Sequence, residues 1–270
     1  MQLHIRHETV YRYGESVKRS VQNLRLTPRR DPVQRALNWN IVAPGRQNEQ
    51  IDAYGNVVHL LTLDEPHREI RIIVNGVVET DDHEGQALPN EGKLSPLTYL
   101  ADTPLTRADA SIHAFASDYL PRSGERRAAL MRLAEAISDT VKYEQGATDV
   151  WESASKAFAR GKGVCQDHAH VFISAVRSLG LPARYVSGYL FSGGDEPSEA
   201  NHAWAEVWIE DLGWVGFDPA NGICPTDSYV RLAAGLDATF AAPIRGMRHG
   251  IANEELDVIV EVQQQISQQQ

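Results

Sequence analysis

The residues that could do chemistry begin with Cys165, one of two cysteines in the chain, within the stretch GKGVCQDHAH. An apolar helix is predicted over residues 164–180, which places this thiol in the first helical turn. The N–H groups there favour negative charge, and the thiolate is the nucleophilic form of cysteine. Gly161 and Gly163 would let a substrate backbone come close. A small buried core residue at a helix start is the alternative, and this stretch alone leaves both open.

A nucleophilic thiol needs a base, and His202 has the best context among the ten histidines. It opens the predicted strand HAWAEVWIE over 202–210, and Trp204 and Glu206 share its face because side chains alternate along a strand. The odd-numbered residues are apolar and are expected to pack against a core. His202 is therefore a candidate general base, with plain packing beside a tryptophan as the alternative.

A third residue should orient the histidine, and the stretch GWVGFDPANG offers Asp218 and Asn221. A simple two-stranded register places residue 209 opposite 214, so that His202 faces Asn221 and Asp218 faces residue 205. This register favours Asn221, although a bulge near Gly216 or a strong twist could bring Asp218 across. The alternative is that DPANG forms only a structural turn, since Asp, Pro, Asn and Gly are typical turn residues. The residues themselves do not settle the choice.

A metal site is the main chemical alternative, with Cys165, His168, His170 and His202 as ligands. Residues 168 and 170 lie about 200° apart around a helix, so they cannot face one ion together. The chain also lacks a Cys-x-x-Cys pair. We therefore expect no metal and no other cofactor.

The elements that must position these residues differ between the two halves of the chain. Short alternating runs with turn residues between them predict an antiparallel β domain over 1–95, with a hairpin turn at Asn75–Gly76. A polar stretch rich in Gly and Pro, 81–96, is predicted to be a linker. The catalytic core is expected over 96–250, followed by a C-terminal strand over 251–263 and a disordered tail over 264–270.

The predicted core begins with helices and continues as a strand meander. Helices are expected over 123–143, 149–160 and 164–180, and strands over 183–190, 202–210 and 214–218. A short helix leading into a strand is expected in TDSYVRLAAGLD. This order predicts an α+β fold with a helix packed on an antiparallel sheet.

Composition excludes several classes of protein. Acidic residues outnumber basic ones by 36 to 26, and the most basic stretch, RLTPRRDPVQR over 25–35, is interrupted by Asp31. We interpret it as a solvated loop, with polyanion binding as the alternative, and expect no nucleic-acid partner. The first residues contain no apolar segment of signal-peptide length, and no run approaches the ~20 apolar residues of a membrane helix. A cytoplasmic protein without a membrane partner is expected. The oligomeric state is not indicated.

Together these stretches resemble the bacterial transglutaminase-like cysteine protease family. The blocks GVCQDHAH, HAWAEVWIE and GWVGFDPANG occur in the family's order, and the start HIRHETVYRYGESV resembles its amino-terminal domain. The resemblance implies a papain-like core with Cys165 as nucleophile, His202 as general base and acid, and Asp218 as the residue that orients it. Ala220 is a mild departure, because threonine is expected there, and it leaves the aspartate in place. The resemblance thus favours Asp218 over Asn221.

The expected reaction is thiol-dependent acyl transfer through a thioester on a peptide or protein amide. The Cys165 N–H is a candidate oxyanion donor, and Asp167 is expected to stabilise the helix start. Transfer to an amine would need a dry groove, which Trp204 and Glu206 could form. The polar loop FSGGDEPSEAN over 191–201 is instead expected to be mobile and wet. We therefore predict a cysteine peptidase or amidase. The alternatives are a transglutaminase and a metal- or partner-binding module on this fold.

Overall fold

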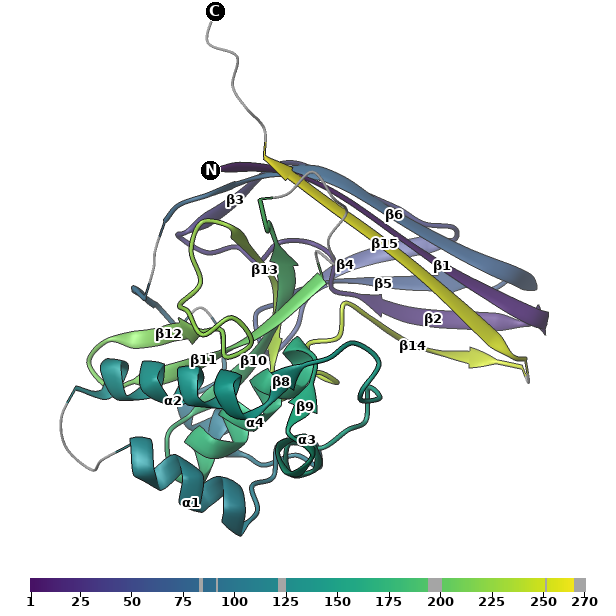
Figure 1. Cartoon of the computed structure of the whole chain (residues 1–270). Helices are drawn as coiled ribbons and strands as arrows, with labels where there is room; N and C mark the ends of the chain where they lie inside the picture. Colours follow the sequence, from purple (N-terminus) through teal and green to yellow (C-terminus); the bar gives the residue numbers. More distant parts are fainter. Residues whose placement is uncertain (83–84, 91, 121–124, 194–200, 251, 265–270) are drawn as a thin grey trace, which may run out of the picture.

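The computed structural model of the chain describes residues 1–82, 85–90, 92–120, 125–193, 201–250 and 252–264. Figure 1 shows a β-rich part formed largely by the first 80 residues and a second part in which helices lie against a sheet. The predicted α+β fold is confirmed. No helix among the described residues is both long and apolar enough to cross a membrane.

The β-rich part consists of two antiparallel four-stranded sheets among the described residues. The first has the order β15 (Glu254–Gln264), β1 (Gln2–Val17), β6 (His67–Thr80) and β3 (Gln34–Val42). The second has the order β14 (Ile244–His249), β2 (Arg19–Leu24), β5 (Val57–Leu63) and β4 (Arg46–Ile51). Side chains of both sheets, such as Leu24 and Leu61 on one and Ile70 and Ile72 on the other, form one buried cluster. The two sheets therefore pack face to face.

The predicted hairpin at Asn75–Gly76 is wrong. Strand β6 runs through both residues, and Gly76 pairs with Ile5 on one side and with Trp39 on the other. A Cβ atom on Gly76 would lie 2.4 Å from the Asn38 carbonyl oxygen and 2.4 Å from a ring carbon of Trp39. The glycine is needed for the close approach of β3, which is the other common reason for glycine inside a strand.

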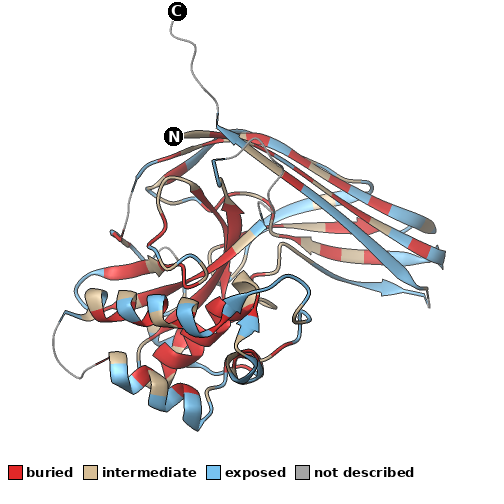
Figure 2. Ribbon diagram, in the orientation of Figure 1, coloured by how far each residue is buried: buried red, intermediate tan, exposed pale blue. Residues whose placement is uncertain are grey.

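The second part is an antiparallel sheet covered by helices (Figure 1). The strand order is β13 (Tyr229–Gly235), β10 (Ala183–Leu190), β11 (Asn201–Ile209), β12 (Gly213–Phe217) and β7 (Ala87–Leu88). The helices are α1 (Ala110–Tyr119), α2 (Arg126–Thr140), α3 (Ala154–Arg160) and α4 (Cys165–Ser178), with a 3-10 turn η1 (Pro96–Leu100) before them. Helix α4 is almost entirely buried (Figure 2), and its Phe172 packs on Phe217 of β12. The prediction of a helix on an antiparallel sheet is confirmed.

Several local predictions differ from the structure. The expected short helix before β13 is absent from the described residues 226–237, where the chain turns directly into the strand. The predicted linker contains β7, which pairs with β12. Strand β14 pairs with β2 of the β-rich part, although the sequence placed its residues in the core. Apart from Gln264, the tail expected to be disordered lies outside the described residues.

A buried ionic network joins the two parts. Glu206 of β11 lies 2.6 Å from the Nε of Arg184 on β10 and 2.8 Å from the Nε of Arg231 on β13. Arg231 also pairs with Asp31 at 2.5 Å, and all four side chains are 2% exposed or less. Burial raises the pKa of Glu206, but the charges of Arg184 and Arg231 outweigh it and hold that pKa at about 2.

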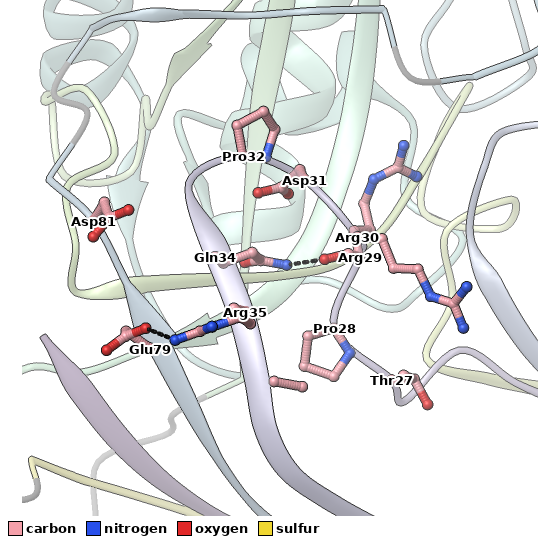
Figure 3. A pocket seen from close by; sticks show the side chains of 11 residues that line it. Thr27, Pro28, Arg29, Arg30, Asp31, Pro32, Gln34, Arg35, Glu79 and Asp81 are labelled. Carbon is pink, nitrogen blue, oxygen red and sulfur yellow. Dashed lines mark hydrogen bonds and ion pairs between the residues drawn. The ribbon is translucent and has the colours of Figure 1, made fainter.

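The stretch 25–35 that contains Asp31 is therefore not the solvated loop that its composition suggests. Arg29 is buried and donates to the Tyr54 carbonyl, and Gln34 donates to the backbone of Arg29 (Figure 3). An open cavity of about 760 Å³ borders this stretch. At its rim, Arg35 pairs with Glu79 (Figure 3). Acidic as well as basic side chains line this cavity, so its electrostatic potential is not the uniformly positive one expected of an anion-binding site.

Glu206→Gln should destabilise the fold by about 3–5 kcal/mol, because Arg184 and Arg231 would stay buried without a counter-charge. The measurement is the free energy of unfolding in urea at pH 7. Because the folded pKa of Glu206 lies below its usual value of 4.5, its contribution is present above pH 4.5 and is lost as pH falls toward about 2.

Glu69→Gln is the matched control, since Glu69 also pairs with arginines but is 45% exposed. It should change the free energy of unfolding by no more than about 0.5 kcal/mol. Equal effects of the two changes would contradict a structural role for the buried network.

Candidate active site

Helix α4 begins at Cys165 because of the residues on either side of it. Asp167 folds back so that its Oδ2 accepts hydrogen bonds from the Val164 N–H at 2.8 Å and from the Thr148 hydroxyl at 2.6 Å. A Cβ atom on Gly163 would lie only 2.6 Å from the Asp167 Cβ, so this fold-back requires glycine. The spacing of Gly163, Cys165 and Asp167 thus places the thiol at the first helical position. Asp167 caps the helix, as the sequence predicts.

His202 lies between Asp218 and Cys165. Its Nε2 is 2.6 Å from the Oδ2 of Asp218, and both side chains are nearly or fully buried. The Cys165 side chain lies close enough to His202 to help raise the pKa of the imidazole. Since Nε2 is engaged by the carboxylate, Nδ1 is the ring nitrogen available to the thiol. The structure thus brings together the three residues that the sequence selected, and Cys165 and Cys224 do not form a disulfide.

His202 and Asp218 shift each other's pKa toward the charged form. Burial lowers the pKa of His202, but its hydrogen bond to Asp218, the nearby Cys165 side chain and the negative charge of Asp218 raise that pKa to about 10. Burial raises the pKa of Asp218, but its hydrogen bond to His202 and the imidazolium charge bring it below its usual value. The arrangement therefore favours a protonated His202 beside the ionised Asp218 carboxylate at neutral pH.

The register of β11 and β12 explains why Asp218 reaches His202. Ala205 pairs with Phe217 and Ile209 with Gly213, one residue away from the predicted register. A slip of one residue exchanges the two faces of a strand. Continuing the observed register places Asp218 opposite Trp204, on the face of His202 and diagonal to it. The register prediction that favoured Asn221 is wrong, and no bulge is required.

Asn221 and Tyr229 act on the carboxylate. The Asn221 amide nitrogen is 2.7 Å from the Oδ2 of Asp218 but 3.5 Å from the Nε2 of His202. The Tyr229 hydroxyl donates to the same Oδ2 at 2.7 Å, and its ring meets His202 edge-on. The sequence did not single out Tyr229, because it lies in the stretch expected to form a helix and reaches Asp218 only through the order of the strands.

Trp204 and Glu206, which could have formed a groove for an amine, do not line one among the described residues. Both side chains are 1% exposed, and Glu206 is held by the ionic network. A Cβ atom on Gly188 would lie 2.6 Å from the Trp204 ring, so this glycine makes room for the indole. Within the loop 191–201, expected to be mobile, residues 194–200 lie outside the described residues.

The two histidines that follow Cys165 have structural contacts. The ring nitrogens of His168 lie 2.9 and 2.6 Å from the carbonyl oxygens of Val164 and Val141. His170 is fully buried, and its Nε2 accepts a hydrogen bond from the Ala238 N–H at 3.1 Å. In the described part of the chain, no group of three or more His, Cys, Asp or Glu side chains is placed to hold a metal ion. The expectation that no metal is needed stays a prediction.

Comparison with known families matches both parts of the chain. Residues 3–79 match the family described as the bacterial transglutaminase-like N-terminal region. Residues 113–219 match the transglutaminase-like superfamily, and this range contains Cys165, His202 and Asp218. The order of the two matches agrees with the two parts seen in the structure.

Relatives and a solved structure extend the match to nearly the whole chain. An uncharacterized protein of Mycobacterium leprae is 30% identical over 274 residues, covering 95% of this chain and 96% of that protein. A protein-glutamine gamma-glutamyltransferase of Pseudomonas aeruginosa is 31% identical over 93 residues, covering 31% of this chain and 13% of that protein. A crystal structure from Cytophaga hutchinsonii, provisionally described as a cysteine protease, has a TM-score of 0.77 at 23% identity. It covers 97% of this chain and 90% of that one, and it shows the same fold.

Asp218→Asn should lower the pKa of His202 from about 10, because it removes the negative charge that the imidazolium faces. The readout is the imidazole chemical shift followed by NMR as pH is raised. Because the folded pKa of His202 lies above 6.5, the stability that its charge contributes is complete below pH 6.5. It is lost as pH rises through about 10.

Tyr229→Phe is the matched control for this titration, because it removes one hydrogen bond but keeps the carboxylate. In Tyr229→Phe the pKa of His202 should stay well above its value in Asp218→Asn. The free energy of unfolding should fall by about 1 kcal/mol. An unchanged His202 titration in Asp218→Asn would show that the two side chains are not coupled.

Proposed function

We propose that this chain, which belongs to the transglutaminase-like superfamily, is a cysteine peptidase or amidase that acts on peptide or protein amides. The observation that carries the proposal is the buried hydrogen bond between His202 and Asp218, with Cys165 close to the same imidazole. A thiol, an imidazole and a carboxylate in this order form the arrangement used for nucleophilic acyl transfer.

In the proposed reaction, the Cys165 thiolate attacks the amide carbonyl carbon and forms a C–S bond. The oxyanion is stabilised by N–H groups at the start of α4, with Cys165 itself as one donor. The His202 imidazolium gives its proton to the leaving amine as the C–N bond breaks, leaving a thioester. Water then attacks the thioester carbonyl and gives its proton to His202. The C–S bond breaks, releasing the acid and returning the thiolate and imidazolium.

Asp218 is proposed to orient the imidazole in this cycle. Its Oδ2 accepts the Nε2–H of His202, so Nδ1 faces the reacting atoms in every step. Asn221 and Tyr229 donate to the same oxygen and hold the carboxylate in position. A negative charge kept beside the ring stabilises the imidazolium form that protonates the leaving amine.

Acyl transfer to an amine is the second candidate function. The similarity of 93 residues to a protein named as a protein-glutamine gamma-glutamyltransferase favours it. The burial of Trp204 and Glu206 argues against it, because these two side chains pack inside the protein and cannot line a binding groove for an amine. An amine competes with water only when the protein holds it in place. Hydrolysis is therefore the proposed main outcome, and a binding module without activity is the remaining alternative.

Cys165→Ala and His202→Ala should each abolish amide turnover in a folded protein, because they remove the nucleophile and the proton carrier. Asp218→Ala should leave measurable residual turnover, since an orienting residue contributes less than the nucleophile. The assay is product release from a peptide library, followed by mass spectrometry, with circular dichroism to confirm folding.

Cys224→Ala is the matched control, since Cys224 is a buried cysteine whose sulfur lies 3.7 Å from the sulfur of Met131. It should keep turnover and labelling by a thiol-directed probe, both of which Cys165→Ala should lose. Near-normal turnover in folded Cys165→Ala would falsify the proposed function.

The acyl acceptor can be tested by product partition. With one good acyl donor and millimolar primary amine, free acid should exceed the new amide, because Trp204 and Glu206 are buried and cannot form an acidic, aromatic-walled groove for an ammonium group. Mass spectrometry of both products measures the ratio. An excess of the new amide would replace hydrolysis with the transglutaminase alternative.

A further inference from the structure

A second cavity, of about 350 Å³, lies beside the nucleophile. Gln166, the residue after Cys165, lines it, and so does Tyr185 of β10, which belongs to the apolar cluster that Cys165 packs against. Most of the lining residues are apolar. Besides Tyr185 they come from two segments, one with Val150 and Trp151 and the other with Ala238, Ala241, Ala242, Pro243 and Ile244. The cavity therefore reaches the residue next to the nucleophile and offers a largely nonpolar surface.

The cavity walls are fixed by hydrogen bonds to the elements that carry the site. The Gln166 side chain donates to the Val150 carbonyl at 3.1 Å and ties the Val150 segment to α4. On the opposite wall, the Ser187 hydroxyl donates to the Ala241 carbonyl at 2.6 Å, and His170 accepts from the Ala238 N–H. The shape is thus largely preformed, as ligand sites usually are.

Two large apolar side chains at the rim have little cover. Val150 is 65% exposed and its neighbour Trp151 is 69% exposed. Adjacent apolar side chains beside a concave site are typical of a ligand-binding surface, and an indole offers a large, rigid contact area. A nonpolar group in the cavity would remove part of both side chains from water.

The position of the cavity indicates which half of a substrate it would hold. His202 must stand beside the leaving amine in order to protonate it. The described lining of the cavity contains Gln166 and Tyr185 but neither His202 nor Asp218. A cavity next to Gln166 but not lined by the proton donor fits the acyl half of the amide better than the leaving amine.

We propose that this cavity is a specificity subsite for a large apolar side chain, aromatic or branched aliphatic, in the acyl half of the substrate. The inference rests on the proposed function and names the substrate class of that site. Among the described lining residues the charged side chain is Arg245, and no Asp or Glu lines the cavity. A basic side chain would meet no counter-charge there and should be rejected.

The test compares acyl donors that share one fluorogenic leaving amine and carry Phe, Leu, Gly or Lys at either of the two residues before it. The Phe or Leu donors should exceed the Gly and Lys donors in kcat/KM by about tenfold or more.

Trp151→Ala should reduce the ratio of kcat/KM for the Phe donor to that for the Gly donor several-fold. Leu97→Ala, which removes a similarly exposed side chain on η1, should leave that ratio unchanged.

A binding measurement separates this inference from the proposed function. Acetylated Phe and Gly dipeptide amides are titrated onto Cys165→Ala by calorimetry, and the Phe ligand should bind more tightly, with the difference reduced by Trp151→Ala. Turnover without preference, or equal binding of the two ligands, overturns the subsite while leaving the hydrolase intact. Selective binding without turnover by the native chain overturns the hydrolase and keeps the subsite.

Discussion

The buried hydrogen bond between His202 and Asp218 is the interaction on which the site depends. A carboxylate with no exposed surface is costly unless its oxygens are satisfied, and here the Oδ2 accepts from His202, Asn221 and Tyr229. These donors come from β11, the turn after β12 and the start of β13. The pair therefore exists only when the sheet is assembled in its observed order, and the site and the sheet form together.

The sheet that carries this pair also packs against the β-rich part. Leu3 and Ile5 of β1 pack in one cluster with Tyr189, Val230 and Leu232 of the core sheet, and Asp31 completes the ionic network around Glu206. The chain returns to the β-rich part through β14 and β15, so its last described strands close sheets that its first strands began. This explains a role for the amino-terminal part that the motifs alone do not reveal.

Glycines show how one residue type serves different purposes in this fold. Gly163 and Gly188 make room for Asp167 and Trp204, and Gly76 makes room for β3. The Asn-Gly pair at Gly76 predicts a turn because such pairs favour tight hairpins. Close approach of a neighbouring strand gives the same preference for glycine, and only the pairing partners distinguish the two. The strand residues on either side of Gly76 were therefore predicted correctly, while the glycine itself was wrongly interpreted as a turn.

The sequence by itself determined the features that depend on near neighbours. The strands Ala183–Leu190 and Glu254–Gln264 and the helix after Gly163 follow from alternation, period and capping within a few residues. The candidate Cys165, His202 and Asp218 also came from the sequence, with the choice of Asp218 resting on family resemblance. Tertiary structure decided the one-residue register that turns Asp218 toward His202, the contact of Tyr229, and the burial of Trp204 and Glu206. These depend on partners far along the chain, whose packing free energy fixes strand order and register where local preference leaves several choices nearly equal.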